Sequence, residues 1–271
     1  MKSGFENIDA DIPALETRRI YAFAAPEAMG KLTFVRQLAL NASLNNGVLY
    51  VQFKSNKQEL LESLLSVKGA IPHYEFDRKP LEQKTAIKVE ETLKSLEDHH
   101  LFMERLNEYD EMDFYKLIRS YVNEHNVKLI IIDDLDTMFG SCKQELDQTK
   151  RFIYTLHLKA MIHEYDCCCI MLTEVPKYSP SSVRKFCLPG LDELGKKRSL
   201  IKVFDEMWMF LRLEYFGVQV DDIGRITERK MDIIRYSYSG KVLDFLYFKF
   251  NENYTSLESL VFPFYWDDEQ E

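Results

Sequence analysis

The chain has 271 residues, a formal net charge of −9, and 46% hydrophobic and 29% charged residues. This composition is ordinary for a globular protein, and the length suffices for one domain with a full hydrophobic core. The acidic balance does not favour a surface that coats single-stranded DNA or other nucleic acid, because such surfaces gather lysine and arginine.

Membrane and secreted classes are also disfavoured. No apolar run approaches the roughly 20 residues of a membrane span, and the N-terminus has no basic segment followed by an apolar one, so we expect no signal peptide and no membrane partner. The five cysteines lack the paired spacing of a metal site. We expect Cys167, Cys168 and Cys169 to be buried thiols of a cytoplasmic protein without a structural metal.

Apolar strands alternate with helical patterns along the chain, which is typical of an α/β fold with a mainly parallel sheet flanked by helices. We expect strands at 19–25, 47–53, 101–105, 128–135 and 167–174, and helices at 33–45, 58–67, 79–99, 112–125 and 144–164. Residues 176–200 are expected to form a surface loop with local helix. Three strands then follow without helices, at 206–213, 231–236 and 243–250, and we expect antiparallel additions to the sheet edge.

The expected organisation is a single domain over residues 1–262 and an acidic tail over 263–271. Two clusters of basic residues are candidate local patches for nucleic acid, although a solvated loop explains each of them more simply. The first cluster is Lys177, Arg184 and Lys185, and the second is Lys196, Lys197 and Arg198.

The first candidate site lies between the first strand and the first helix. A phosphate-binding loop has the pattern G-x-x-x-x-G-K-[ST], in which glycines let backbone N–H groups surround phosphates, the lysine reaches the terminal phosphates and the hydroxyl ligates magnesium. Gly30 and Lys31 match, whereas Ala25 replaces the first glycine and Leu32, which cannot ligate a metal, replaces the hydroxyl. The nucleotide-binding candidates are Ala25, Pro26, Glu27, Ala28, Met29, Gly30, Lys31, Leu32 and Thr33.

A second candidate lies at the end of the apolar run 129–133. Ligands of open α/β sheets bind outside the carboxyl ends of the strands, which is where Asp133 is expected. An aspartate at this place in nucleotide hydrolases holds Mg²⁺, usually through water. The alternative is that Asp133 and Asp134 only cap the segment that follows.

These segments together resemble the RecA-like motor domain of DnaB-type replicative helicases. That domain opens with Thr-Gly-Phe-x-x-Leu-Asp, and residues 3–9 read Ser-Gly-Phe-Glu-Asn-Ile-Asp. Its phosphate loop often reads Ala-Arg-Pro-x-Met-Gly-Lys-Thr and lacks the first glycine, which is similar to residues 24–31 here. The likeness covers nearly the whole chain and implies a RecA-like P-loop NTPase fold that binds ATP with Mg²⁺.

The resemblance assigns roles residue by residue, and several positions depart from the family. Lys31 and Asp133 match the family's lysine and its metal-site aspartate. Lys54 stands where the family has its catalytic glutamate, and a lysine that is protonated near neutral pH cannot activate water in that way. Glu174 aligns with the sensor glutamine, and Arg235 aligns with the arginine finger.

The loss of a metal ligand at Leu32 and of a base at Lys54 favours a DnaB-like domain in DNA replication or mobile-element maintenance that binds nucleotide weakly, hydrolyses it poorly and serves as a scaffold. One alternative is an active DNA-dependent ATPase or helicase, in which Thr33 and either Glu59 or Glu174 compensate. Another alternative is a RecA-superfamily regulator of the KaiC or RadA type.

The expected partners are other replication proteins or an active helicase. No segment of the chain matches the family's N-terminal domain or its linker helix, which makes a hexamer doubtful. Arg235 would act in trans only if a ring formed.

Overall fold

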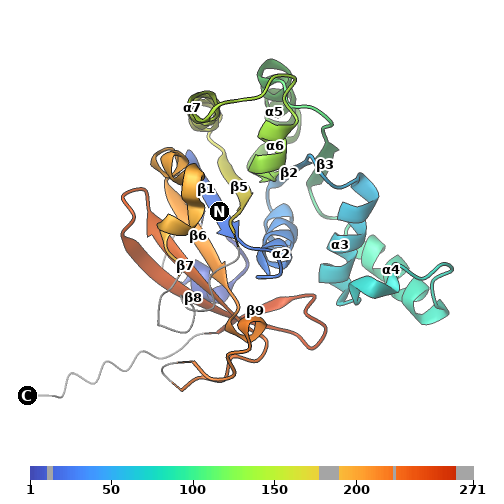
Figure 1. Cartoon of the computed structure of the whole chain (residues 1–271). Helices are drawn as coiled ribbons and strands as arrows, with labels where there is room; N and C mark the ends of the chain where they lie inside the picture. Colours follow the sequence, from blue (N-terminus) through green and yellow to red (C-terminus); the bar gives the residue numbers. More distant parts are fainter. Residues whose placement is uncertain (11–14, 177–188, 222–223, 261–271) are drawn as a thin grey trace, which may run out of the picture.

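The computed structural model describes residues 1–10, 15–176, 189–221 and 224–260. Within these residues a nine-stranded sheet runs through the molecule in the order β3-β2-β4-β5-β1-β6-β7-β8-β9 (Figure 1). The strands are β1 (Arg19–Ala25), β2 (Gly47–Gln52), β3 (Leu101–Arg105), β4 (Val127–Asp133), β5 (Cys168–Glu174), β6 (Glu206–Leu211), β7 (Lys230–Ser237), β8 (Val242–Phe250) and β9 (Leu257–Leu260).

The sheet has a parallel part and an antiparallel part. The strands from β3 to β6 pair in parallel, and β7, β8 and β9 continue the sheet antiparallel to their neighbours, which confirms the predicted α/β class and edge additions. All of β2 and β6 is buried, as are the first six residues of β5. Parallel strands that are covered on both faces appear in the sequence as continuous apolar runs. This is why these strands could be predicted well from the sequence.

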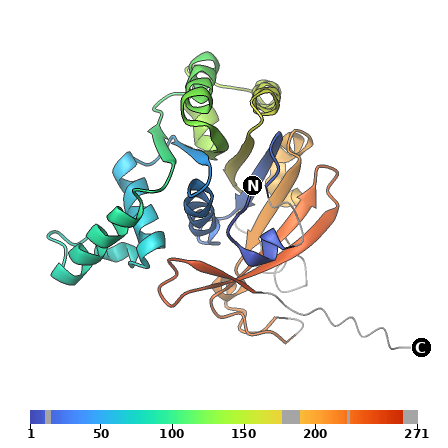
Figure 2. The same cartoon turned by 180° about the vertical axis from the view of Figure 1, so that it is seen from behind.

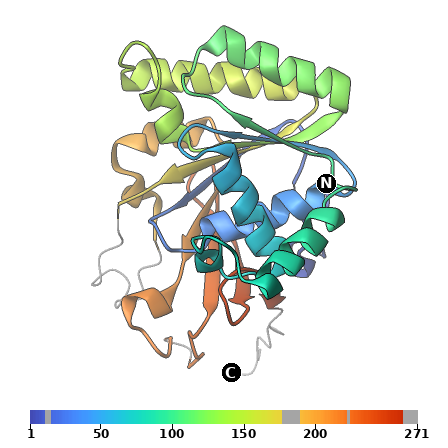
Figure 3. The same cartoon turned by 90° about the vertical axis from the view of Figure 1, so that its right-hand side faces the viewer.

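Helices cover the two faces of the sheet. They are α1 (Glu6–Asp9), α2 (Lys31–Ser43), α3 (Lys57–Gly69), η1 (His73–Glu75), α4 (Gln83–Ser95), α5 (Glu111–His125), α6 (Leu135–Gly140), α7 (Gln148–Glu164), η2 (Leu191–Lys202) and η3 (Leu213–Phe216). Figure 3 shows α5 and α7 side by side across one face, with α2, α3 and α4 on the other.

Right-handed crossovers explain this division. The connections β1-α2-β2 and β2-α3-α4-β3 step along the sheet in one direction, while β3-α5-β4 and β4-α6-α7-β5 step back in the other. Helices of opposite steps must therefore lie on opposite faces. The antiparallel strands extend the sheet beyond β6, as Figure 2 shows from behind.

Most of the long elements match their predicted ranges within a few residues, and the differences have local causes. The helix expected at 144–164 begins at Gln148, because the Asp147 side chain caps it by accepting a 2.8 Å hydrogen bond from the Lys150 N–H. The short elements α1, α6, η1, η3 and β9 were not predicted. Segments of three to six residues are too short to show a hydrophobic period.

The opening segment has a clear structural role. Asp9 accepts hydrogen bonds from the Ser3 N–H at 2.8 Å and from the Gly4 N–H at 2.9 Å, which closes residues 3–9 into a compact turn. Asn7 then fixes this turn to the antiparallel strands, donating to the Tyr247 carbonyl at 2.9 Å and accepting from the Ser259 hydroxyl at 2.8 Å. The segment therefore joins the N-terminal residues to β8 and β9.

The structure also describes the three consecutive cysteines and the second basic cluster. Cys167, Cys168 and Cys169 are buried free thiols. Of the second basic cluster, Lys197 pairs with Asp136 at 2.6 Å and Arg198 pairs with Asp192 at 2.5 Å.

The first basic cluster and the acidic tail over 263–271 lie outside the described residues. The boundary at 262 remains a prediction, although one main hydrophobic cluster runs from Phe5 to Leu257. In the part of the chain that the structure describes, no helix is long and apolar enough to cross a membrane.

Candidate functional site

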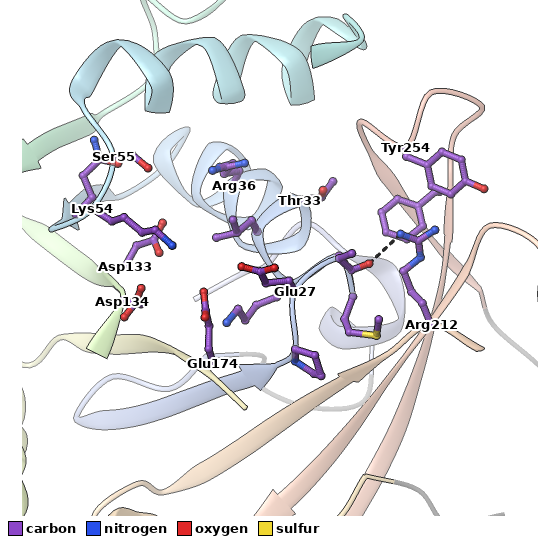
Figure 4. Close-up of a pocket in the computed structure, with 18 residues that line it drawn as sticks. Glu27, Thr33, Arg36, Lys54, Ser55, Asp133, Asp134, Glu174, Arg212 and Tyr254 are labelled. Atoms are coloured by element: carbon purple, nitrogen blue, oxygen red, sulfur yellow. Dashed lines mark hydrogen bonds between the residues drawn. The ribbon is translucent and has the colours of Figure 1, made fainter. Parts of the chain in front are cut away.

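The carboxyl ends of four parallel strands meet at one edge of the sheet. Ala25 at the end of β1 is in register with Glu174 of β5, and Gln52 at the end of β2 is in register with Asp133 of β4. Between these ends and the first turn of α2 lies a cavity of about 450 Å³ (Figure 4). The predicted residues 26–33, 54, 133 and 174 all line this cavity, whereas Ala25 does not.

The loop between β1 and α2 has the backbone form of a phosphate-binding loop. Ala28 and Gly30 have positive φ angles of 64° and 87°, a conformation found where backbone N–H groups surround an anion. Gly30 is also required sterically, because a Cβ there would lie 2.5 Å from Phe250 Cζ. The first intrahelical bond of α2 runs from the Phe34 N–H to the Gly30 carbonyl, so the amides of residues 31–33 have no partner within the helix and are placed to meet a ligand.

Lys31 is held at the base of this loop. Its side chain is buried, and Nζ donates a 2.6 Å hydrogen bond to the carbonyl of Thr173 on β5. Burial lowers the pKa of Lys31, while the carboxylates of Asp133 and Glu174 act in the opposite direction. A phosphate would favour the charged form of this amine, so the lysine is placed to respond to an anion.

Asp133 lies at the expected end of β4, with a partner that the sequence did not reveal. The Tyr50 hydroxyl donates a 2.9 Å hydrogen bond to Asp133 Oδ2. Burial raises the pKa of Asp133, and the Tyr50 hydrogen bond and the neighbouring Arg36 lower it. The aspartate is therefore already held by groups of the protein.

Asp134 performs the capping role that the sequence left open for this pair. Its Oδ1 accepts from the Thr137 N–H at 2.7 Å and its Oδ2 accepts from the Thr137 hydroxyl at 3.0 Å, at the start of α6. Within the first turn of α6, Asp136 Oδ2 accepts from the Thr173 hydroxyl at 3.0 Å and pairs with Lys197. These contacts fix the end of β5, from which the exposed Glu174 enters the cavity.

The first turns of α2 place an unexpected cation at the site. Leu32, whose side chain remains 37% exposed, and Thr33 line the cavity, and Arg36 does so four residues after Leu32. Residues four apart share a helix face, so Arg36 and Leu32 lie on the same side of α2, and Arg36 is close enough to Asp133 to lower the pKa of that carboxyl. No motif in the sequence identified Arg36.

Three residues from the end of β2 complete this side of the cavity: Gln52, Lys54 and Ser55. Lys54 is exposed, and Figure 4 shows its side chain directed into the cavity. Gln52 is buried, and among the described residues its Nε2 has no hydrogen-bond partner. A positive charge thus stands at the position that the resemblance assigns to a catalytic glutamate.

The donor set does not fit a magnesium ion held as the resemblance implies. Mg²⁺ takes oxygen ligands in octahedral geometry, and at nucleotide sites one or two protein groups bind it beside phosphate oxygens and waters. Leu32 offers no oxygen, both Asp134 oxygens cap α6, and Asp133 is hydrogen-bonded to Tyr50 with Arg36 nearby. Within the described residues no group of three or more histidine, cysteine or acidic side chains could hold a metal.

Arg212, which directly follows β6 and which the sequence did not identify, closes the other side of the site together with the end of β8. Its guanidinium donates a 2.9 Å hydrogen bond to the carbonyl of Ala28 in the loop. The Arg212 Cζ atom lies 4.9 Å from the ring centres of both Phe250 and Tyr254. This stacking fixes the loop to the end of β8.

Two other sequence candidates lie apart from the cavity. Arg235 is only 5% exposed within β7, where its guanidinium forms a 2.9 Å ion pair with Glu206 and lies over Trp208. An arginine finger must reach a neighbouring site, and this burial does not support that assignment. Glu59 accepts from the Asn56 N–H at 3.2 Å in a capping box at the start of α3.

Comparisons with known proteins agree with the fold and with the resemblance. The family model described as "DnaB-like helicase C terminal domain" matches residues 1–258. No curated protein matches the chain.

The solved structures that the chain resembles include that of a DnaB-like replicative helicase, described with its interactions with primase. This match has a TM-score of 0.79, 18% identity, and coverage of 96% of this chain and 63% of that one. They also include a structure described as an ATPase domain, with a TM-score of 0.77, 18% identity, and coverage of 96% and 91%. At this identity the structural matches bear on the fold alone, and they confirm the predicted RecA-like architecture.

Proposed function

The chain belongs to the family of DnaB-like helicase C-terminal domains, and we propose that it is a nucleotide-binding member whose capacity to hydrolyse ATP is impaired. One contrast within the cavity carries this proposal. The loop, Lys31 and the start of α2 keep the form of a phosphate cradle, while Leu32 and Lys54 stand at the positions for metal ligation and water activation.

The charges in the cavity support binding without turnover. Lys31, Arg36 and Lys54 can attract phosphates, and the free amides of α2 add hydrogen-bond donors. A lysine at the position of the base holds a proton near neutral pH and cannot accept one from water. Loss of a general base alone costs about 10²–10⁴-fold in rate, and loss of a metal ligand adds to it.

In this proposal the protein acts by binding, as a scaffold in DNA replication or mobile-element maintenance. One structural match is a replicative helicase described with its interactions with primase, which supports a replication protein or an active helicase as the partner of this chain. This chain spans 63% of that helicase, so that protein's partners are carried over only as a proposal. The net charge of −9 favours a protein partner over single-stranded DNA.

ATP turnover tests the proposal directly. Phosphate release is measured with Mg²⁺, with and without single-stranded DNA, for the unmodified protein and for Lys31→Ala. We expect both proteins to release phosphate at the same background rate. Turnover of about 1 s⁻¹ or more, within the ordinary range of enzymes, that Lys31→Ala abolishes would overturn the impaired state.

A second candidate function, an active ATPase, has one observation in its favour. Glu174 is an exposed carboxylate in the cavity, and Thr33 supplies a hydroxyl one residue from the expected position. If these residues compensate, Glu174→Gln must abolish a measurable turnover. Glu59 does not line the cavity, and the matching family model gives the KaiC or RadA alternative no separate support.

A further inference from the structure

Two buried N–H donors on one side of the cavity lack an acceptor. Among the described residues, Arg36 Nε and Gln52 Nε2 are buried without a hydrogen-bond partner, and both residues line the cavity. Gln52 is only 2% exposed. An unsatisfied buried donor costs about 1–3 kcal/mol, so both groups are expected to pair with an acceptor in the cavity, either a water or a ligand group.

Of the four carboxylate oxygens of Asp133 and Asp134, which line the same cavity, three already accept hydrogen bonds. Asp133 Oδ2 accepts from Tyr50 at 2.9 Å, and both oxygens of Asp134 accept from Thr137. Arg36 lies close enough to Asp133 to lower the pKa of that carboxyl, which places a cation beside the aspartate. A divalent cation at this place would meet the positive charge of Arg36 and find few free oxygens.

Both donors without a partner among the described residues, Arg36 Nε and Gln52 Nε2, can donate hydrogen bonds to an anion. Resting on the proposed nucleotide binding, we propose that this cavity takes the phosphates of a nucleoside polyphosphate in the metal-free form, with Arg36, Gln52 and Lys54 in the place of magnesium. Lys31 and the loop amides hold the same phosphates from the other side.

In the described part of the chain, four acidic side chains line the cavity beside four basic ones, so the assignment rests on where the basic groups stand and not on net charge. Both donors line the cavity near Asp133, because Gln52 is in register with Asp133 at the end of β2 and the charge of Arg36 is close enough to lower the pKa of that carboxyl. Lys54 is exposed at the mouth of the same side and adds a second positive charge. Hydrogen bonds from charged donors to phosphate are among the stronger ones, so fixed side chains can supply the charge that a bound cation otherwise provides.

The test measures ATP affinity by isothermal titration calorimetry, once with excess Mg²⁺ and once with EDTA. We expect ATP to bind at least as tightly with EDTA as with Mg²⁺. Arg36→Gln removes the charge and should weaken binding in EDTA by about tenfold or more, the order expected for a charged hydrogen bond. Gln52→Met keeps the shape and removes the donor, and it should weaken binding by a smaller factor.

Arg119→Gln is the matched control, because Arg119 is an exposed arginine on α5 and does not line the cavity. It should bind ATP as the unmodified protein does. Binding that appears only with Mg²⁺ would overturn this inference and leave the proposed function intact, whereas no binding in either buffer would overturn both. The comparison of buffers needs no variant, so it decides the question even if Arg36→Gln fails to fold.

Discussion

The Tyr50 hydroxyl lies 2.9 Å from Oδ2 of Asp133 and donates a hydrogen bond to it across the ends of β2 and β4. Burial raises the pKa of Tyr50 well above its ordinary value, and the Asp133 carboxylate raises it further, so the tyrosine remains a donor at any moderate pH. The aspartate that the family uses at its metal site is therefore part of a buried pair. This pair stabilises the sheet edge and removes one oxygen from metal binding.

Removing the hydroxyl should cost stability. We expect Tyr50→Phe to lower the free energy of unfolding by about 1–3 kcal/mol, because the buried Asp133 loses its donor. Urea unfolding followed by circular dichroism measures this change. Tyr74→Phe is the control, since Tyr74 is 59% exposed, and it should change the value by less than about 0.5 kcal/mol. Equal effects of the two variants would show that the hydrogen bond to Asp133 contributes nothing.

Arg235 should behave as a structural residue. It is buried in an ion pair with Glu206, and its removal leaves this buried carboxylate with a more distant partner, Arg19, at 3.7 Å. Arg235→Met should lower the free energy of unfolding by about 3–5 kcal/mol. The double variant Arg235→Met with Glu206→Gln should recover part of that loss. A stable Arg235→Met protein that lost only nucleotide turnover would instead support the arginine-finger assignment.

The pH dependence of stability should contain a contribution from Asp232. Burial raises the pKa of Asp232 to about 6, and Arg225, which lies 3.5 Å from it, opposes the rise. The folded state thus holds this proton more tightly than the unfolded state, whose pKa is about 3.9. The contribution of the group is fully present below the unfolded pKa and is lost as the pH rises through about 6.

Asp232→Asn isolates this contribution. Between about pH 5 and pH 7 the unmodified protein should lose about 1 kcal/mol of unfolding free energy that the variant does not lose. Urea unfolding of both proteins at the two pH values gives the difference. Parallel pH profiles for the two proteins would mean that Asp232 titrates alike in the folded and unfolded states.

The sequence predicted the parts of the site that follow from periodicity and motif. Gly30, Lys31 and Asp133 belong to a strand-loop-helix motif and a strand end, and a parallel sheet brings such ends together. Arg36, Gln52 and Arg212 could not be found this way. Their roles depend on tertiary contacts with Asp133 and Ala28, which lie far away in the chain. The pairing of Arg235 with Glu206 depends likewise on the register of β6 and β7.

Restoring the family's residue types at positions 32 and 54 tests whether these two positions alone account for impaired hydrolysis. Leu32→Thr with Lys54→Glu supplies a metal ligand and a carboxylate at the mouth of the cavity. We expect the double variant to gain nucleotide affinity or turnover in Mg²⁺ relative to the unmodified protein. Each single variant serves as a control and should gain less. A folded double variant that remains inert would show that positions other than these two also prevent hydrolysis.

Nucleotide binding to the folded protein is the central claim, and a thermal unfolding experiment with ATP tests it most directly. A ligand that binds only the folded state adds about 2.7 kcal/mol of stability at 100 times its Kd, which corresponds to several degrees in Tm for a chain of this size. We predict a rise in Tm that grows with ATP concentration in EDTA and is absent in Lys31→Ala. An unchanged Tm at saturating ATP, with and without Mg²⁺, would contradict the account.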